Sequence, residues 1–354
     1  MENQKVVICT DFENEVQTFL SEMNYDKLFI LTDENTLEKC YPRVKNIPAF
    51  HDSPVITINA GDMHKSLEQL SSIWTALSNG GASRNSLLVN LGGGMVTDMG
   101  GFAGATFKRG LHTINIPTTL MASVDAAVGG KTGINFNGLK NEIGSFYVPE
   151  CVFIDCEFLR TLDRDNILSG YAEMMKHALI SSVDNYASVM LFDLDAKMDF
   201  AFLNKMVAQS VAVKEHIVEE DPQEHGIRKA LNFGHTIGHA YESLSFQKNT
   251  PLLHGHAVAA GLVSELYLSH VVCNFPMDKL RQVVYYIKEY YRPFHFDCND
   301  YEALYSLMTH DKKNEAGIIN FTLLSQIGDV RINQQVSKEK ILESLDFYRE
   351  SFGV

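Results

Sequence analysis

The feature that most constrains the fold is an alternation, over the first 155 residues, of short β-branched runs with segments of helical periodicity. Several runs are apolar nearly throughout, which is typical of strands that helices cover on both faces. The runs occupy residues 5–9, 28–32, 55–59, 86–90, 113–117 and 151–155. The pattern predicts a parallel sheet in a Rossmann-like α/β domain, which we place at residues 1–158.

The rest of the chain has a different pattern, in which long helical stretches dominate. Helices are expected at 165–182, 200–219, 230–247, 254–272, 278–291 and 337–350. One exception is 318–333, where a turn at Gly328 between two β-rich segments predicts a small hairpin. A length of 354 residues exceeds what one core usually supports. We therefore expect a second, mainly helical domain at 159–354.

Charge and composition exclude several classes of protein. A formal net charge of -14 disfavours binding to nucleic acid and to anionic membranes. The acidic N-terminal segment lacks the basic start and the apolar stretch of an export signal. The longest apolar run, at 257–272, is interrupted by Ser264, Glu265 and His270. Six cysteines without C-x-x-C spacing fit a reducing compartment, so we expect a cytoplasmic protein.

A glycine-rich loop follows the strand expected at 86–90. It reads Leu91-Gly92-Gly93-Gly94-Met95-Val96-Thr97-Asp98, and a helix is expected next. Backbone N–H groups at such a helix start can bind a pyrophosphate. The spacing is not G-x-G-x-x-G, and glycines also form plain tight turns. Asp33, Asn35, Thr118 and Thr119 follow other strands at the same sheet edge, and this shared position favours a dinucleotide site.

A candidate metal site lies in the helical part. His235 and His239 are one helical turn apart and project from one face, and His254 opens the next expected helix. Upstream, Glu173 and Lys176 form a charged pair within an apolar helical surface. One carboxylate with two or three imidazoles suits a zinc-type ion that keeps an open, catalytic coordination position. Spacing alone does not select the three ligands.

Basic residues recur beside these motifs in an otherwise acidic chain. Lysine binds phosphate as a point charge and arginine binds carboxylate or phosphate as a bidentate fork. Taken singly, each is more often a solvated surface charge, but Lys131 lies between glycines that let a ligand approach. The set comprises Lys108, Arg109, Lys131, Lys140, Lys176, Lys214, Arg228, Lys312 and Lys313. Together they indicate a small anionic substrate.

Six ordered segments resemble the 3-dehydroquinate synthase family of sugar phosphate cyclases, relatives of glycerol and iron-type alcohol dehydrogenases. The segments cover nearly the whole chain. They are GGGMVTDMGGFAGATFKRG, IPTTLMASVDAAVGGKTGIN with GLKNEIGSFY, YAEMMKHALI, EHGIRKALNFGHTIGHAYE, LLHGHAVAAG and HDKKNEAG. The resemblance implies bound NAD, Zn2+ or Co2+ as the metal ion, an anionic sugar phosphate substrate and a homodimer.

The resemblance also implies roles for individual residues. Glu173, His235 and His254 would hold the metal ion, with His239 in the active site as a residue that is not a ligand. The residues implied for NAD are Asp33, Asn35, Asp62, Lys65, Gly93, Gly94, Met95, Val96, Thr97, Asp98, Thr118, Thr119, Lys131, Lys140, Phe158, Leu159, Arg160 and Thr161. Those implied for substrate and catalysis are Asp125, Lys131, Asn141, Lys176, Lys214, Glu224, Arg228, Asn232, His239, Lys312 (with Lys313 as the alternative) and, lent to the neighbouring subunit, Arg109.

The reaction implied is conversion of 3-deoxy-D-arabino-heptulosonate 7-phosphate to 3-dehydroquinate and phosphate. The alternatives are a cyclase acting on sedoheptulose 7-phosphate, a metal-dependent polyol dehydrogenase, and a non-catalytic protein on the same scaffold. Lys214, Arg228 and the lysine pair Lys312-Lys313 favour the first reaction, because in the second these cations would lack a substrate carboxylate as partner. Two positions depart from the family pattern: Thr97 replaces a common glycine, and His256 replaces a frequent acidic residue.

Overall fold

The computed structural model describes residues 4–137, 139–309 and 318–354, which form two compact units. Unit 1 comprises Met1–Asp163 and Phe200–Val211, and unit 2 comprises Arg164–Asp199 and Ala212–Val354. These units differ from the predicted stretches 1–158 and 159–354 in two places. Residues 159–163 and the first half of helix α8 (Phe200–Glu220) belong to unit 1.

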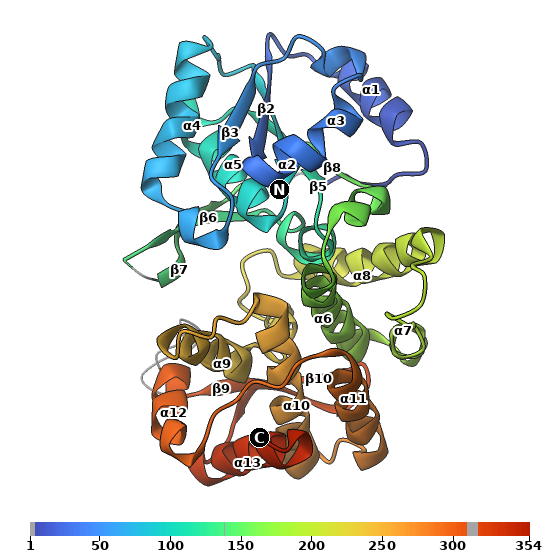
Figure 1. Ribbon diagram of the computed structural model, residues 1–354, viewed down its shortest axis with the longest axis vertical. Helices are drawn as coiled ribbons and strands as arrows, with labels where there is room; N and C mark the ends of the chain where they lie inside the picture. Colours follow the sequence, from blue (N-terminus) through green and yellow to red (C-terminus); the bar gives the residue numbers. More distant parts are fainter. Residues whose placement is uncertain (1–3, 138, 310–317) are drawn as a thin grey trace. The chain divides into compact units, whose positions relative to one another are not determined.

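Unit 1 is built on a six-stranded sheet (Figure 1), with the strand order β1-β8-β5-β4-β2-β3. Its strands are β1 (Val6–Ile8), β2 (Leu28–Asp33), β3 (Val55–Ile58), β4 (Leu87–Gly92), β5 (His112–Pro117) and β8 (Cys151–Ile154). Every neighbouring pair is parallel. Each strand matches one predicted run, and the predicted α/β fold class is confirmed.

Helices cover both faces of this sheet, which explains why its strands are apolar on both sides. The helices are α1 (Phe12–Glu22), α2 (Glu34–Lys39), α3 (Tyr41–Val44), α4 (Leu67–Asn79) and α5 (Gly94–Thr106). Successive residues of β4 point to opposite faces. Val89 packs in one core with residues of α1 and α3, while Leu88 packs in the other with residues of α4 and α5.

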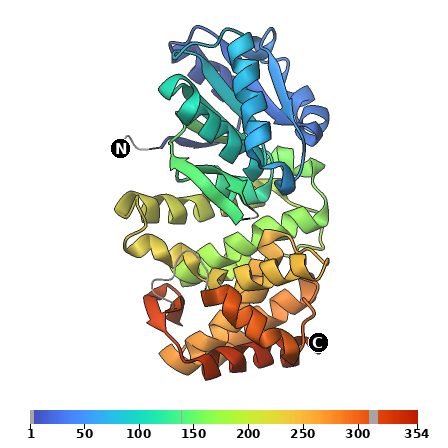
Figure 2. The ribbon, with the colours of Figure 1, turned by 90° about the vertical axis from the view of Figure 1, so that its left-hand side faces the viewer.

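A second element of unit 1 is the antiparallel hairpin of β6 (Lys131–Phe136) and β7 (Leu139–Phe146), drawn as green arrows in Figure 2. The sequence patterns did not predict it, because β7 is exposed along its length and has no apolar alternation. Gly144 permits the two strands to approach, since a Cβ there would overlap the carbonyl of Thr132. The hairpin exposes four large apolar side chains: Phe136, Leu139, Ile143 and Phe146.

Unit 2 is mainly helical, as predicted; in Figure 2 its first helices are green and its later elements yellow to red. Its elements are α6 (Arg164–Ser181), α7 (Val183–Met190), the end of α8, α9 (His235–Gln247), α10 (His254–Cys273), α11 (Met277–Tyr290), α12 (Tyr301–Thr309), the hairpin β9 (Asn320–Gln326) and β10 (Asp329–Gln335), and α13 (Lys338–Phe352). Helix α10 is long and apolar enough to cross a membrane, but 67% of its apolar window is buried inside the protein, as in a core helix.

Helix α9 begins at His235, later than the start predicted at residue 230. The preceding Gly234 has φ +79°, a left-handed backbone that ends the short 3-10 helix Ile227–Asn232 before α9 starts. A Cβ at Gly234 would also lie 2.7 Å from Leu262 Cδ2. The glycine therefore fixes His235 as the first residue of the helix.

Candidate functional site

The glycine loop joins β4 to α5 at the carboxyl edge of the sheet. Gly93 is the N-cap of α5, and Gly94, Met95 and Val96 form its first turn. The amide of Thr118 donates to the carbonyl of Gly92 at 3.0 Å, so the Thr118-Thr119 segment lies directly beside the loop. A Cβ at Gly93 would lie 2.9 Å from Thr119 Cγ2, which favours glycine there. The free N–H groups of this helix start can bind an anion.

Several polar residues predicted for the cofactor gather around Lys65, which is only 3% exposed. Its ammonium lies 2.5 Å from Asp98 Oδ2 on α5 and donates to Asn141 on β7. Lys140 forms an ion pair with Asp62 at 3.0 Å. Residues far apart in the sequence thus form one charged cluster. Asp98 connects this cluster to the beginning of α5.

Other predicted cofactor residues have local structural partners. Asp33 is the N-cap of α2 and accepts from the amide of Thr36 at 2.7 Å, with Asn35 in the first turn. Phe158 and Leu159 are buried, and Thr161 Oγ1 lies 3.9 Å from Cys40 Sγ. Asp33, Phe158, Leu159 and Thr161 therefore also have structural contacts within unit 1.

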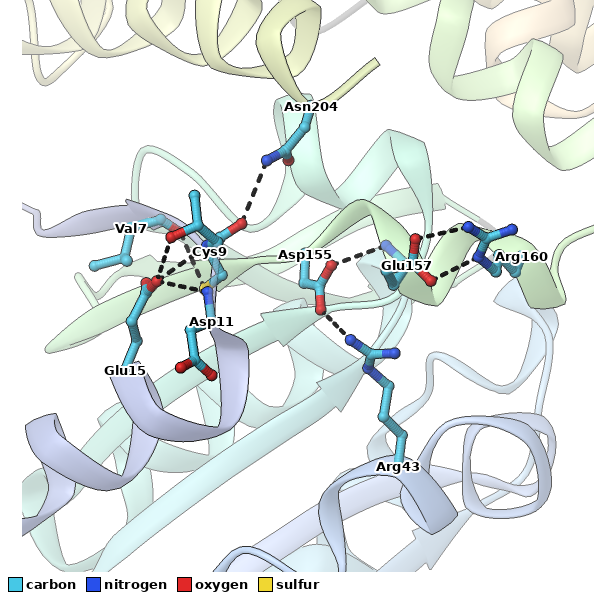
Figure 3. A network of polar contacts seen from close by, with 10 residues as sticks. Val7, Cys9, Asp11, Glu15, Arg43, Asp155, Glu157, Arg160 and Asn204 are labelled. Atoms are coloured by element: carbon cyan, nitrogen blue, oxygen red, sulfur yellow. Dashed lines mark hydrogen bonds and ion pairs between the residues drawn. The ribbon is translucent and has the colours of Figure 1, made fainter. Parts of the chain in front are cut away.

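Polar contacts fix the segments just beyond the carboxyl ends of β1 and β8 (Figure 3). Asp155 accepts from Arg43 at 2.6 Å and from the amide of Glu157 at 2.9 Å. Glu157 in turn accepts two hydrogen bonds from Arg160. Burial, together with the nearby carboxylates of Glu15 and Asp155, raises the pKa of the Cys9 thiol far above its usual range, so Cys9 stays protonated.

In unit 2 the structure brings four predicted side chains together. His235 begins α9, His239 follows one turn later, His254 begins α10, and Glu173 lies on α6. One nitrogen of each histidine lies within 4.8 Å of the others. Glu173 Oε1 lies 3.4 Å from Nε2 of His235 and 3.4 Å from Nε2 of His254. These four side chains are the candidate metal cluster.

The spacing of the cluster fits a zinc-type ion. Donor atoms on a tetrahedral ion with bonds of about 2.1 Å lie about 3.4 Å from one another. Glu173 is fully buried, and its two oxygens face titratable groups of unit 2. Lys176 Nζ lies 2.5 Å from Oε2 and leaves Oε1 directed at the two imidazoles. A buried carboxylate oxygen in this state suits a cation.

Neighbouring charges shift the pKa values of two residues of the cluster, Glu173 and His254. Burial opposes ionisation of Glu173, but the ammonium of Lys176 and the imidazole of His235 outweigh it and hold the pKa well below its usual range. Burial would lower the pKa of His254, but the carboxylates of Glu242 and Glu173 raise it to about 10. A metal ion bound to His254 would replace that proton.

A loop before α9 holds three residues predicted for the substrate. Asp221 accepts from the backbone amides of His225, Gly226 and Arg228 at 3.0, 2.6 and 3.0 Å, and so fixes the loop. Arg228 is only 2% exposed and donates to the carbonyl of Pro222. Asn232 donates to Glu224 at 2.9 Å. The predicted Lys214, on α8, is 6% exposed and provides a further buried cation in unit 2.

The remaining predicted residues belong to unit 1. Asp125 lies in the π-helical turn Ala122–Ala126, Lys131 begins β6, and Arg109 follows Lys108 with both at positive φ, 67° and 48°. Their convergence with the unit 2 residues in one pocket stays a prediction from the family resemblance. Lys312 and Lys313 lie outside the described residues.

Sequence reasoning missed two buried carboxylates beside the metal cluster. Glu242 accepts from His254 Nδ1 at 3.2 Å. Glu265 accepts from the amides of Gly234 and Ile237. One signal was available for each: Glu242 follows His239 at a helical spacing of three, and Glu265 is a lone acid in an apolar helix.

Known proteins resemble this chain over its length. Profiles of the N-terminal and C-terminal parts of the 3-dehydroquinate synthase family match residues 55–169 and 170–314. The 3-dehydroquinate synthase of Parabacteroides distasonis is 76% identical over 354 residues, which is the whole of both chains. That of Clostridium tetani is 35% identical over 331 residues, 90% of this chain and 85% of its own.

Solved structures share the fold. The 2-epi-5-epi-valiolone synthase ValA from Streptomyces hygroscopicus, solved with NAD+ and Zn2+, has a TM-score of 0.86 at 22% identity and covers 99% of this chain and 98% of its own. An iron-containing alcohol dehydrogenase from Thermotoga maritima has a TM-score of 0.67 at 14% identity, with 99% and 98% covered. The fold is thus that of the sugar phosphate cyclases and iron-type alcohol dehydrogenases.

Within this class the full-length identity and the two family profiles decide the assignment. The chain belongs to the 3-dehydroquinate synthase family.

Proposed function

We propose that the protein is a carbon–oxygen lyase that converts 3-deoxy-D-arabino-heptulosonate 7-phosphate to 3-dehydroquinate and phosphate, in aromatic amino acid biosynthesis in the cytoplasm. The observation that carries the proposal is the buried Glu173 carboxylate facing two imidazoles at 3.4 Å, in a chain of this family. The substrate would undergo transient oxidation of a ring hydroxyl, loss of phosphate, re-reduction and intramolecular aldol closure, without net redox change.

The candidate cofactors are NAD and Zn2+ or Co2+. Glu173, His235 and His254 would hold the metal ion, and the glycine loop with the Lys65 cluster would hold NAD. When bound, the ion supplies Lewis-acid polarisation of substrate hydroxyls and NAD supplies a reversible hydride acceptor. That neighbouring cyclase structures contain NAD+ with Zn2+ or Co2+ supports this assignment.

The chain's own side chains would bind the substrate and move its protons. Lys214 and Arg228 would hold the carboxylate, because buried cations favour an anionic partner. Lys131, Asn141 and a partner-supplied arginine at position 109 would hold the phosphate. The imidazole of His239 lies beside the metal cluster, with its ring centroid 5.3 Å from that of His235, and would accept the hydroxyl proton.

We further propose a homodimer. The exposed apolar side chains of the β6–β7 hairpin in unit 1 support it, since large apolar patches commonly mark interfaces. Arg109 supports it as well. Lys108 and Arg109 both have a left-handed backbone, and strained backbone of this kind is commonly found at functional sites. This fits the role in the neighbouring subunit that the family resemblance implies for Arg109.

The deciding experiment incubates the purified protein with NAD, Zn2+ and the heptulosonate phosphate. Release of inorganic phosphate and formation of 3-dehydroquinate, without accumulation of NADH, are expected. A matched reaction contains sedoheptulose 7-phosphate, which has no carboxylate for Lys214 and Arg228. Turnover of that substrate alone would favour the related cyclase activity. Net formation of NADH from a polyol would instead identify a dehydrogenase. Chelation of the metal should abolish turnover, and added Zn2+ or Co2+ should restore it.

A further inference from the structure

Both helices that begin at a candidate metal ligand lack an N-cap side chain of their own. Helix α9 starts at His235 after Gly234, and α10 starts at His254 after Leu253. Glycine has no side chain, and that of leucine is apolar. The first amides of a helix need acceptors that the helix itself does not supply, so neighbouring elements must provide them.

The acceptor for α9 comes from α10. Glu265, fully buried, accepts from the amides of Gly234 and Ile237 at 2.7 and 2.9 Å. These two amides flank His235 in sequence, so one carboxylate fixes the backbone that carries this ligand. A carboxylate also suits the positive end of the helix dipole.

The reverse contact runs from α9 to α10. Glu242, 5% exposed, accepts from His254 Nδ1 at 3.2 Å. Because Nδ1 donates to Glu242, Nε2 is the ring nitrogen that faces Glu173 Oε1, 3.4 Å away, and is the one left to bind an ion. Ser169 on α6 adds a neutral contact at the same helix start, because its Oγ accepts from the amide of Gly255 at 3.1 Å.

We propose that Glu242 and Glu265 are reciprocal positioning residues. Glu242 on α9 fixes the orientation of His254 at the start of α10, and Glu265 on α10 fixes the backbone of His235 at the start of α9. The inference rests on the metal site of the proposed function and adds two residues to it. Hydrogen bonds to the outer side of ligands fix ligand orientation and raise metal affinity. Close packing keeps the helices in place, since a Cβ at Gly238 would lie 3.0 Å from the carbonyl oxygen of Ala257.

The same helix pair offers a matched control. Tyr241 on α9 and Ser264 on α10 share a buried hydrogen bond of 2.9 Å, which joins the helices without touching a ligand. Tyr241→Phe therefore removes a cross-helix bond of comparable burial. If the carboxylates merely hold the helices together, this control and the Glu variants will behave alike.

The experiment measures Zn2+ affinity by competition with a chromophoric chelator, the visible spectrum of the Co2+ protein, and the melting temperature without metal. Glu242→Gln and Glu265→Gln should each weaken Zn2+ binding by about 10- to 100-fold and alter the Co2+ bands. Tyr241→Phe should lower the metal-free melting temperature while Zn2+ affinity and Co2+ bands stay as in the wild type.

Wild-type affinity in both Glu variants would overturn the inference, and so would an equal loss in Tyr241→Phe. If Glu265→Gln does not fold, Glu242→Gln and the shorter Glu265→Asp still decide the matter. A wild-type protein that binds neither Zn2+ nor Co2+ is a separate result, because it removes the metal site of the proposed function itself.

Discussion

At the scale of single residues, the charged pair on α6 is buried beside the candidate metal cluster. Glu173 is 0% exposed and Lys176 is 1% exposed, and their charged groups lie 2.5 Å apart. Removing two charges from water is costly, and their mutual attraction recovers this cost only in part. A pair kept only for stability could be replaced by apolar residues. Its position beside His235 and His254 supports the metal site proposed above.

Glu173→Gln is expected to destabilise the metal-free protein by about 3–5 kcal/mol, because it leaves the buried ammonium of Lys176 without a counter-charge. The double variant Glu173→Gln/Lys176→Met should recover most of this stability but none of the metal binding. Urea unfolding and Zn2+ titration measure the two effects. Zn2+ affinity that recovers together with stability would contradict the ligand assignment of Glu173.

His239→Asn tests the proton-relay assignment. We expect kcat to fall by about 100- to 10,000-fold, the usual contribution of general acid–base catalysis, with Zn2+ affinity within a few-fold of the wild type. Steady-state kinetics and the same metal titration provide the readouts. A variant that retains full turnover would refute the relay, and one that loses the metal would make His239 a ligand.

At the scale of elements, glycines set how closely α5 approaches the sheet. A Cβ at Gly100 would overlap the side-chain amide of Asn90 on β4, and one at Gly104 would overlap Thr113 on β5. Asn90 is itself fixed, since it donates to Asn115 at 2.8 Å. The small residues therefore bring the N-terminus of α5, with its glycine loop, directly to the ends of the strands, as dinucleotide-binding loops require.

Gly100→Ala should destabilise the protein by about 1–3 kcal/mol, because overpacking outweighs the gain in helix propensity. Chemical denaturation measures the change. The relaxed pair Gly100→Ala/Asn90→Ala provides the control and should recover part of the loss. An unchanged or raised stability in the single variant would show that α5 packs less tightly than described.

At the scale of the whole molecule, the sequence predicted the elements whose residues carry a periodic apolar signal. Six β-branched runs became the six parallel strands, and the histidines four residues apart lie on α9. The β6–β7 hairpin escaped prediction because Gly133, Gly144 and a row of exposed polar residues give no such signal. Its two strands pair with each other through backbone hydrogen bonds, and the hairpin also contacts α5.

The positions of Glu242 and Glu265 could not be predicted for a different reason. Which side chain of one helix reaches the start of another depends on the register between helices, and this is a tertiary property. Spacing showed Glu265 only as a charge that interrupts an apolar run. Likewise, spacing brought four possible metal ligands together without choosing among Glu173, His235, His239 and His254.

The proposed dimer makes a prediction for the hairpin surface. The wild-type protein should have the mass of two chains in light scattering after size-exclusion chromatography. Leu139→Asp/Phe146→Asp places charges on the exposed apolar face and should give a monomer with strongly reduced turnover. Arg109→Ala should lose turnover but stay dimeric. If the hairpin variant remains dimeric, the dimer interface does not include this hairpin face.

The left-handed turn at Lys108 and Arg109 has a consequence for the evolution of the chain. Each such residue costs on the order of 1–3 kcal/mol, whereas glycine adopts this backbone freely. Replacing Lys108 with glycine would relieve this strain but would remove the hydrogen bond from Lys108 Nζ to the carbonyl of Ala82, at 2.6 Å. The chain thus has two cations where glycine would relax the turn, and it holds their charge there at a cost in backbone energy.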